Sequence, residues 1–389
     1  MTHTKIEWDD LPATVWLGSF NSGNGGATES HAMIEPNDVF ASAKEQYLIL
    51  EEAAQRLVRD GMTLVWKHFF VSDAFNQYAY LTASAGEAVS VVQQPPLNGS
   101  KASLWLYFAE NAQMSNDPEG GTMMKRPHHT HLFHTQLHER SAVESQSPLM
   151  ALPSSSGHQT NRILNRYSQS LSNHGCTLER NCIRTWVYVQ DVDVQYAGMV
   201  TARREFFESE GLTPQTHFIA STGIEGRYIY PDVLVHMDAY TVAGIDPVQI
   251  KYLHASTHLN PTHEYGVTFE RGTSVDYGDR RHVFISGTAS INNRGKIEHP
   301  MDVEKQTGRT FENVRALLAE AGAGMDDVAC MIVYLRDTAD FAVTDRYLNI
   351  HYPAIPRLTL LAPVCRPGWL VEVECIAVKS IKNNEYANF

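Results

Sequence analysis

The chain has 389 residues, of which 43% are hydrophobic and 19% charged, and its formal net charge is −13 at pH 7. This length exceeds what one small core needs, so we expect two or three domains with the composition of an ordinary globular protein. The negative charge argues against a nucleic-acid partner, and no window approaches the 18 apolar residues of a membrane-spanning helix.

The N-terminal residues and the cysteines favour a reducing, cytoplasmic location. The first sixteen residues, MTHTKIEWDDLPATVW, have no basic segment followed by an apolar stretch, so they do not resemble a secretory signal. The five cysteines form no C-x-x-C pair, and an odd count at irregular spacing is a poor disulfide framework. We therefore expect a cytoplasmic protein with no membrane partner.

Helical and β-rich segments alternate in the first third of the chain. Residues 45–61 form an amphipathic segment that ends at Gly61, sixteen positions after its start. A β-rich segment, a second helical segment and two further β-rich segments follow, at residues 62–73, 75–86, 88–95 and 101–109. Two polar, turn-rich stretches, 22–30 and 111–129, are expected to be mobile.

A histidine-rich segment, HHTHLFHTQLH at residues 128–138, raises the question of a metal site. His129 and His131 would share one face of a strand, but no carboxylate or cysteine nearby completes a tetrahedral set. We therefore favour an exposed hairpin and expect no metal and no other cofactor.

The order of segments in the first third returns twice more. Residues 159–191 and 306–337 both begin with Gln-Thr, reach a glycine sixteen positions later (Gly175 and Gly322) and end in a Val-Tyr strand. In each copy a second helical segment and two strands follow. Coincidence of so many features is improbable for a pair of segments this long, so we interpret them as an internal repeat.

The repeat predicts an α+β fold. The order β-α-β-α-β-β occurs three times, which places helices on one face of a mixed sheet in each copy. The predicted modules are residues 1–110, which are the most divergent, residues 111–250, and residues 251–389.

Two charged side chains of the last module lie on segments that otherwise resemble buried strands. Arg357 and Glu372 are fifteen positions apart, and buried charges are costly unless they are paired or used. Either they form a structural ion pair or they share a ligand. A shared ligand is chemically reasonable, because arginine binds a carboxylate through two donors and a glutamate can act as general acid or base. Glu374 shares the strand face of Glu372.

Other candidates for the same pocket lie close by. Cys365 precedes Glu372 by seven positions, and Ser286, Gly287 and Thr288 form a turn at the end of a strand. Each also has a purely structural interpretation: a cysteine is often a small core residue, and a glycine can simply satisfy a turn.

The last module resembles the RidA/YjgF family. The resemblance is carried by VFISGTAS, QTGRTFENVRALLAEAG, VYLRDTADF, IPRL and VEVECIAV, which lie between residues 283 and 378. Proteins of this family are trimers of one small, chorismate-mutase-like α+β unit, with sites in the clefts between units. The resemblance therefore implies three tandem modules in a fused pseudo-trimer. It also implies that Arg357 binds a substrate carboxylate and that Glu372 handles a proton or water.

The chain is similar in more detail to the chorismatases, which are RidA-like enzymes on one long chain. The similar segments are RTWVYV (184–189), GTASI (287–291) and VCRPGWLVEVE (364–374). This resemblance implies that Glu372 protonates the enolpyruvyl methylene group and that Cys365 belongs to the same pocket. The second module has His217 near the position of Arg357, so we expect its own site to be degenerate.

These features predict an enzyme that acts on a small carboxylate with an activated C=C or C=N bond. Chorismatase-like hydrolysis of an enolpyruvyl ether is favoured over RidA-type imine deamination, and a non-catalytic protein that binds a small ligand is a further alternative. RNA cleavage, suggested only by an older name of the family, lacks the basic surface it needs. The expected partner is a small carboxylate, and assembly into a homo-oligomer is left open.

Overall fold

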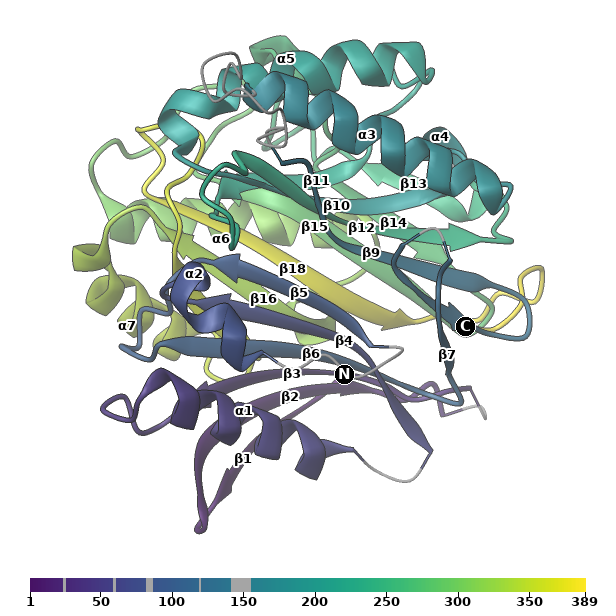
Figure 1. The fold of residues 1–389 in the computed structure, drawn as a ribbon. Helices are drawn as coiled ribbons and strands as arrows, with labels where there is room; N and C mark the ends of the chain where they lie inside the picture. Colours follow the sequence, from purple (N-terminus) through teal and green to yellow (C-terminus); the bar gives the residue numbers. More distant parts are fainter. Residues whose placement is uncertain (24–25, 59–60, 82–86, 119, 141–154) are drawn as a thin grey trace, which may run out of the picture.

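Three six-stranded sheets, one in each third of the chain, form the framework of the protein (Figure 1). The structure is a computed structural model, and it describes residues 1–389 apart from 24–25, 59–60, 82–86, 119 and 141–154. Each sheet is accompanied by the helices of its own third, so the chain is organised as three successive modules.

The modules share one succession of elements. The first contains β1 (Thr2–Trp8), β2 (Leu11–Phe20), β3 (Glu29–Pro36), α1 (Ala43–Leu57), β4 (Met62–Val71), α2 (Ala74–Gln77), β5 (Ala88–Gln93) and β6 (Ala102–Glu110). The second contains β7 (Gln113–Asn116), β8 (Thr122–Lys125), β9 (Thr130–His138), α3 (Ser156–Asn173), α4 (Leu178–Asn181), β10 (Cys182–Val189), α5 (Val192–Ser209), β11 (Ala220–Glu225) and β12 (Val235–Ala243). The third contains β13 (Ile250–Leu253), β14 (Gly272–Asp276), β15 (Arg280–Ala289), α6 (Val303–Glu320), β16 (Val328–Leu335), α7 (Phe341–His351), β17 (Arg357–Leu361) and β18 (Val371–Ser380).

The three sheets also share one strand order. It is β1-β2-β3-β6-β4-β5 in the first, β7-β8-β9-β12-β10-β11 in the second and β13-β14-β15-β18-β16-β17 in the third. In each sheet the last two strands are parallel and are joined by a crossover through α2, α5 or α7, whereas the other pairs are antiparallel. The three orders coincide, which confirms the predicted threefold repeat of an α+β unit.

Local signals set the ends of the long helices. Gly61, Gly175 and Gly322 follow α1, α3 and α6 with φ angles of 83°, 66° and 70°, a region that glycine adopts without a steric penalty. At the start of α6, the side chain of Asp302 accepts a hydrogen bond from the backbone N–H of Lys305. In the described part of the chain, no helix is both long and apolar enough to cross a membrane.

The structure differs from the sequence-based expectations at the start of each module. Three strands, not one, precede the first long helix, and the second module takes β7 and β8 from the stretch 111–129 that we expected to be mobile. In the first module the predicted second helix is reduced to the four residues of α2, and residues 82–86 of that prediction lie outside the described residues. Residues 24–25 of the other stretch expected to be mobile also lie outside them.

The histidine-rich segment is a core strand and not an exposed hairpin. Residues 130–138 form β9, which pairs with β12 in the middle of the second sheet. His129, His131 and His134 are 5%, 0% and 1% exposed. Their imidazole rings pack among aromatic neighbours, which the alternating histidines of the sequence do not reveal.

The modules close into a ring. Isolated backbone bridges join Gln93 to Arg227 and Pro96 to Leu360, and two more, Ala220 to Glu270 and Ile224 to Val364, join the second module to the third, so every pair of modules is linked. Edge strand β5 of the first module packs on β9 of the second, and edge strand β11 of the second packs on β15 of the third. The three modules thus surround one pseudo-threefold axis, and each boundary between neighbouring modules is called a cleft; the one between the second and third modules contains a cavity.

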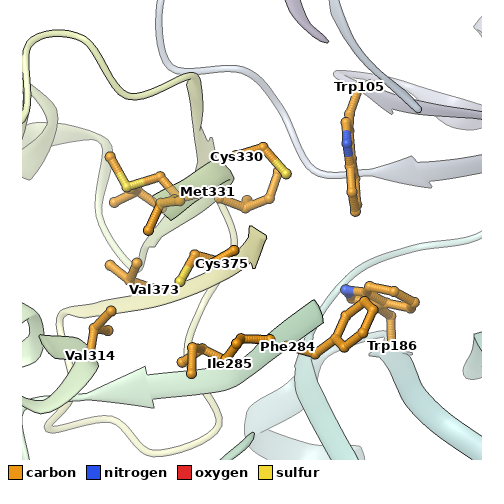
Figure 2. Packing of buried hydrophobic residues seen from close by; sticks show 14 of the residues in the cluster. Trp105, Trp186, Phe284, Ile285, Val314, Cys330, Met331, Val373 and Cys375 are labelled. Carbon is orange, nitrogen blue, oxygen red and sulfur yellow. The ribbon is translucent and has the colours of Figure 1, made fainter. Parts of the chain in front are cut away.

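The largest core cluster draws on all three modules. Trp105 and Trp186 approach each other near the centre, with ring centroids 6.1 Å apart, and Phe284 of the third module lies beside them (Figure 2). Val373 of β18 faces away from these aromatic rings and lies near Val314 of α6 (Figure 2). One face of β18 therefore packs on its own helix, and the opposite face meets a neighbouring module.

Candidate active site

Strand β18 presents two carboxyl groups to the second module. Glu372 pairs with Tyr334 and Glu374 pairs with Ile332 across the antiparallel ladder to β16. The two glutamates are two positions apart, so they share one face of the strand, as the sequence predicts. They are 5% and 4% exposed, and a buried carboxyl group needs a partner or a use.

Glu374 is fully partnered by the second module. Its carboxylate accepts hydrogen bonds from Arg184 Nη2 (2.7 Å), from Trp186 Nε1 (2.8 Å) and from the hydroxyl of Thr222. Arg184 is itself 1% exposed. Charge-assisted bonds of this kind are strong in a buried setting, so Glu374 joins the second and third modules.

Glu372 has no such partners. No hydrogen bond or ion pair from the described residues reaches its carboxyl group, which faces a cavity. Burial raises the pKa of Glu372 to about 8, and the negative charge of Glu374 adds to the rise, whereas Arg184 and Arg271 oppose it. The carboxyl group is therefore protonated at neutral pH and can donate its proton.

The cavity lies between the second and third modules. The second module contributes Tyr196 and Arg203 from α5 and Ser221 from β11, and the third contributes the Arg366–Trp369 turn among other residues. The free volume is about 20 Å³, which is roughly the space of one water molecule. A larger ligand therefore binds only when lining side chains move.

Three arginines line this cavity: Arg203, Arg271 and Arg366. Arg203 is 3% exposed, and its Nε and Nη2 atoms have no hydrogen-bond partner in the described structure. Arg271 and Arg366 each donate to a backbone carbonyl group. Because a buried guanidinium group with unpaired donors is costly and arginine binds carboxylates through paired donors, the cavity is suited to an anion.

Sequence reasoning missed Arg203, although a signal exists. In α5, Tyr196, Met199, Arg203 and Phe206 follow one another at helical spacing, and the last three are buried. An arginine on the apolar stripe of an amphipathic helix is unusual and indicates either a paired charge or a ligand.

Cys365 lies in the cavity, as the sequence suggested. Burial raises the pKa of its thiol to about 12, so the group is a neutral thiol and not a thiolate nucleophile. Its neighbour Tyr196 also has a raised pKa, because of burial and then because of Cys365. Both groups can donate a hydrogen bond without carrying charge.

Of the three turn candidates, Gly287 lines the cavity. A Cβ atom added to it would lie 2.3 Å from Glu372 Oε1, so glycine leaves the space that the carboxyl group occupies. The hydroxyl groups of Ser286 and Thr288 donate to the backbone carbonyls of Glu270 and Ser286. They fix the bulge of β15 and do not line the cavity.

Arg357 does not reach this cavity. It is the first residue of β17 and pairs with Met331 of β16. Glu372 pairs with Tyr334, which lies three residues further along β16. Because side chains alternate along a strand, an odd spacing places Arg357 and Glu372 on opposite faces of the sheet. The ion-pair partner of Arg357 is Asp345, at 3.8 Å. The expectation that Arg357 and Glu372 converge on one anion is therefore wrong.

The ring of modules explains this separation. An edge strand borders the next module, so the cleft of Glu372 is bordered by β11 and not by β17. The pairing registers make Ser221 the equivalent of Arg357. His217, which we expected near that position, lies upstream of the strand and contacts the hydroxyl of Tyr252 at 3.1 Å.

The same registers identify the equivalents of Glu372 in the other modules. They are Ser103, which pairs with Phe70, and His236, which pairs with Tyr188. Glu372 is therefore the acid among three equivalent positions, and the second module completes its cleft.

Comparison with known proteins relates the last module to one family. The sequence model of a family described as Endoribonuclease L-PSP matches residues 274–379. A RutC family protein of Pyrococcus abyssi is 34% identical over 100 residues, which are 25% of this chain and 78% of that protein. A RutC family protein of Saccharolobus solfataricus is 32% identical over 102 residues, which are 25% of this chain and 79% of that protein.

A solved structure extends the similarity over more than one module. The crystal structure of a chorismatase covers 81% of this chain and 93% of its own, with a TM-score of 0.62 and 18% sequence identity. At this identity the similarity concerns the fold, and it spans far more of the chain than the RutC relatives do.

Proposed function

This chain belongs to the RutC family, within the RidA/YjgF (L-PSP) superfamily, and we propose that it is an enzyme that hydrolyses an enolpyruvyl ether of a small carboxylate. The observation that carries the proposal is the cavity between the second and third modules. There, the unpartnered and protonated Glu372 lies in the same lining as the unpartnered guanidinium donors of Arg203. A neutral acid beside a cationic anchor suits the protonation of carbon in an anionic substrate.

In this proposal the arginines of the cavity, Arg203 foremost, bind the substrate carboxylate. Glu372 donates its proton to the terminal CH₂ carbon, and the C=C electron pair forms the new C–H bond. Positive charge develops on the ether carbon, and water adds there and returns a proton to Glu372. The hemiketal then loses its alcohol by cleavage of the carbon–oxygen bond, so enol ether and water give pyruvate and alcohol.

The surroundings of Glu372 support the same division of roles. An ionised glutamate would repel a bound carboxylate, whereas a protonated one does not. The neutral thiol of Cys365 adds no competing charge. Aromatic residues of the lining, such as Tyr265 and Trp369, help to exclude bulk water from the site.

The alternative is RidA-type imine deamination, which one observation favours. Arg357 lies at the position that the family resemblance implies, within the residues 274–379 that the family model matches. That site would lie between the third and first modules, because β17 borders the first module. The position equivalent to Glu372 in that cleft is Ser103, which cannot act as an acid near neutral pH.

Pyruvate release tests the proposal. The purified full-length chain is incubated with chorismate, and pyruvate is measured through lactate dehydrogenase and NADH consumption. We expect turnover that depends on Glu372. Ammonia release from freshly generated 2-iminopropionate, with no pyruvate from chorismate, would favour the deaminase. A higher melting temperature with small carboxylic acids, but no product in either assay, would leave a binding protein.

A further inference from the structure

One hydroxyl group connects the second module to both sides of the candidate acid. Thr222 Oγ1 accepts hydrogen bonds from Arg184 Nη2 (2.5 Å) and from the backbone N–H of Gly287 (2.9 Å), and it donates to Glu374. Thr222 is 1% exposed. Its position is therefore fixed by three groups from two modules.

The Gly287 bond places backbone against the candidate acid. Gly287 belongs to the bulge of β15, and its Cα hydrogen points to Glu372 Oε1, because a Cβ in that direction would lie 2.3 Å from this oxygen. As long as Thr222 accepts the N–H of Gly287, that N–H is not available to Glu372. On this side the carboxyl group of Glu372 therefore meets a Cα hydrogen and not an N–H group, which would stabilise its ionised form.

The Glu374 bond places a charge close to the same carboxyl group. Glu374 and Glu372 are two residues apart on one strand face, which is about 7 Å along the strand. Glu374 accepts from three donors of the second module, whereas Glu372 accepts from none in the described structure. The two glutamates therefore share a face but have opposite environments.

Other charged and titratable groups also surround Glu372. Those that pack against it or line its cavity are Arg184, Arg203, Arg271, Arg366, Glu374, Tyr196, Tyr265, Tyr334 and Cys365. Glu374 is the anion among these groups, and the arginines would all favour an ionised Glu372. Burial of the carboxyl group, together with the negative charge of Glu374, offsets their effect.

We propose that Thr222 and Glu374 are positioning residues that keep Glu372 in its protonated, proton-donating form. The contact between the second and third modules thus sets the protonation state of Glu372. This inference deepens the proposed function, on which it rests for its role in turnover. Neither residue lines the cavity, and both act through Glu372.

The experiment measures the titration of Glu372 in the free protein. Glutamate labelled with ¹³C at the side-chain carboxyl carbon is incorporated, and the Glu372 resonance is identified by its loss in Glu372→Gln. The pH at the midpoint of this titration is then compared in the wild type, Glu374→Gln, Thr222→Val and Thr222→Ser. Asp238→Asn is the matched control, because Asp238 occupies the position of Glu374 in the cleft between the first and second modules.

We expect a midpoint near 8 in the wild type, as burial and Glu374 indicate. The midpoint should fall by about one unit or more in Glu374→Gln, because a like charge is removed, and by about half a unit in Thr222→Val, because the N–H of Gly287 is freed. Thr222→Ser, which keeps the hydroxyl, and Asp238→Asn should match the wild type. The pH at which kcat declines on the alkaline side should fall by the same amounts.

An unchanged midpoint in both Glu374→Gln and Thr222→Val would overturn the inference, as would an equal shift in Asp238→Asn. If Glu374→Gln does not fold, because a buried Arg184 has lost its partner, Thr222→Val decides alone. The titration needs no substrate. A wild-type midpoint near 8 without pyruvate release would therefore count against the proposed function and leave this inference in place.

Discussion

The cleft between the second and third modules and the cleft between the first and second modules have the same supporting arrangement. In the former, the hydroxyl of Thr222 donates to Glu374; in the latter, the hydroxyl of Ser90 donates to Asp238. The bulge N–H of Gly287 binds Thr222, and the corresponding N–H of Gln136 binds Asp238 directly, at 2.7 Å. Hydroxyl, buried acid and bulge therefore recur at both boundaries.

The two clefts differ at the position beside this arrangement. Glu372 faces a cavity with arginines, whereas His236 is 0% exposed and stacks on Tyr188 with ring centroids 4.8 Å apart. Burial lowers the pKa of His236 well below its usual value, so its ring is neutral, and neither ring nitrogen has a hydrogen-bond partner among the described residues. The repeat places the same hydroxyl, buried acid and bulge at both boundaries. The adjacent side chain, Glu372 or His236, and the helix opposite it determine whether the site can donate a proton.

The largest effect should come from removing the acid. Glu372→Gln keeps the shape of the side chain but not its proton, so kcat should fall by roughly 100-fold or more. His236→Gln, at the equivalent position of the other cleft, should leave kcat unchanged. The coupled pyruvate assay compares the two variants, and equal losses in both would erase the distinction between the clefts.

The next effect should come from the anchor that only one cleft possesses. Arg203→Ala removes the buried guanidinium group, so KM for the carboxylate substrate should rise about tenfold or more, as expected for a lost charge-assisted bond. Arg204→Ala is the matched control, since the neighbouring Arg204 is exposed. Initial rates over a range of substrate concentrations separate KM from kcat. A KM that Arg203→Ala does not change would place the anchor elsewhere.

The pH dependence of turnover should report the acid. Because the pKa of Glu372 is raised to about 8, the active protonated form predominates at neutral pH and is lost as the pH rises through about 8. The kcat profile should therefore decline on the alkaline side. A decline that begins near pH 5 would mean that Glu372 is ionised in the working enzyme.

Stability should depend on pH with opposite signs in the two clefts. The pKa of Glu372 is about 8 in the folded chain and 4.5 in its ordinary state, so its contribution to stability is lost as the pH rises between these values. The pKa of His236 lies below 6.5 in the folded chain, so its contribution is lost as the pH falls below 6.5. Urea unfolding at pH 5, 6.5 and 8 should show that Glu372→Gln reduces the alkaline loss and His236→Gln reduces the acid loss.

The smallest effect should come from Arg357, which borders the third cleft. Arg357→Ala removes an ion pair with Asp345 and a hydrogen bond to a backbone carbonyl, so the free energy of unfolding should fall by about 1 kcal/mol. Chorismate turnover should stay within about threefold of the wild type, because the side chain lies outside the cavity. A loss as large as that of Glu372→Gln would restore Arg357 to the active site.

The sequence alone determined the repeat and the strand face on which Glu372 lies. Helical periodicity, the glycines after the long helices and the alternation of Glu372 with Val373 are local properties, since they depend on residues a few positions apart. They were sufficient to predict three α+β modules and to indicate that Glu372 and Glu374 both face away from the core of their own module.

Only the tertiary structure decided which groups meet that acid. Arg203 lies 169 positions from Glu372 in the sequence and lines the same cavity because the second module borders the third. Arg357, only fifteen positions away, lies on the opposite face beyond an intervening strand. Spacing along the chain fixes the face of a strand to which a side chain points, but the neighbour across that face is set by how whole modules pack. A site at a module boundary therefore depends on contacts that no local pattern encodes.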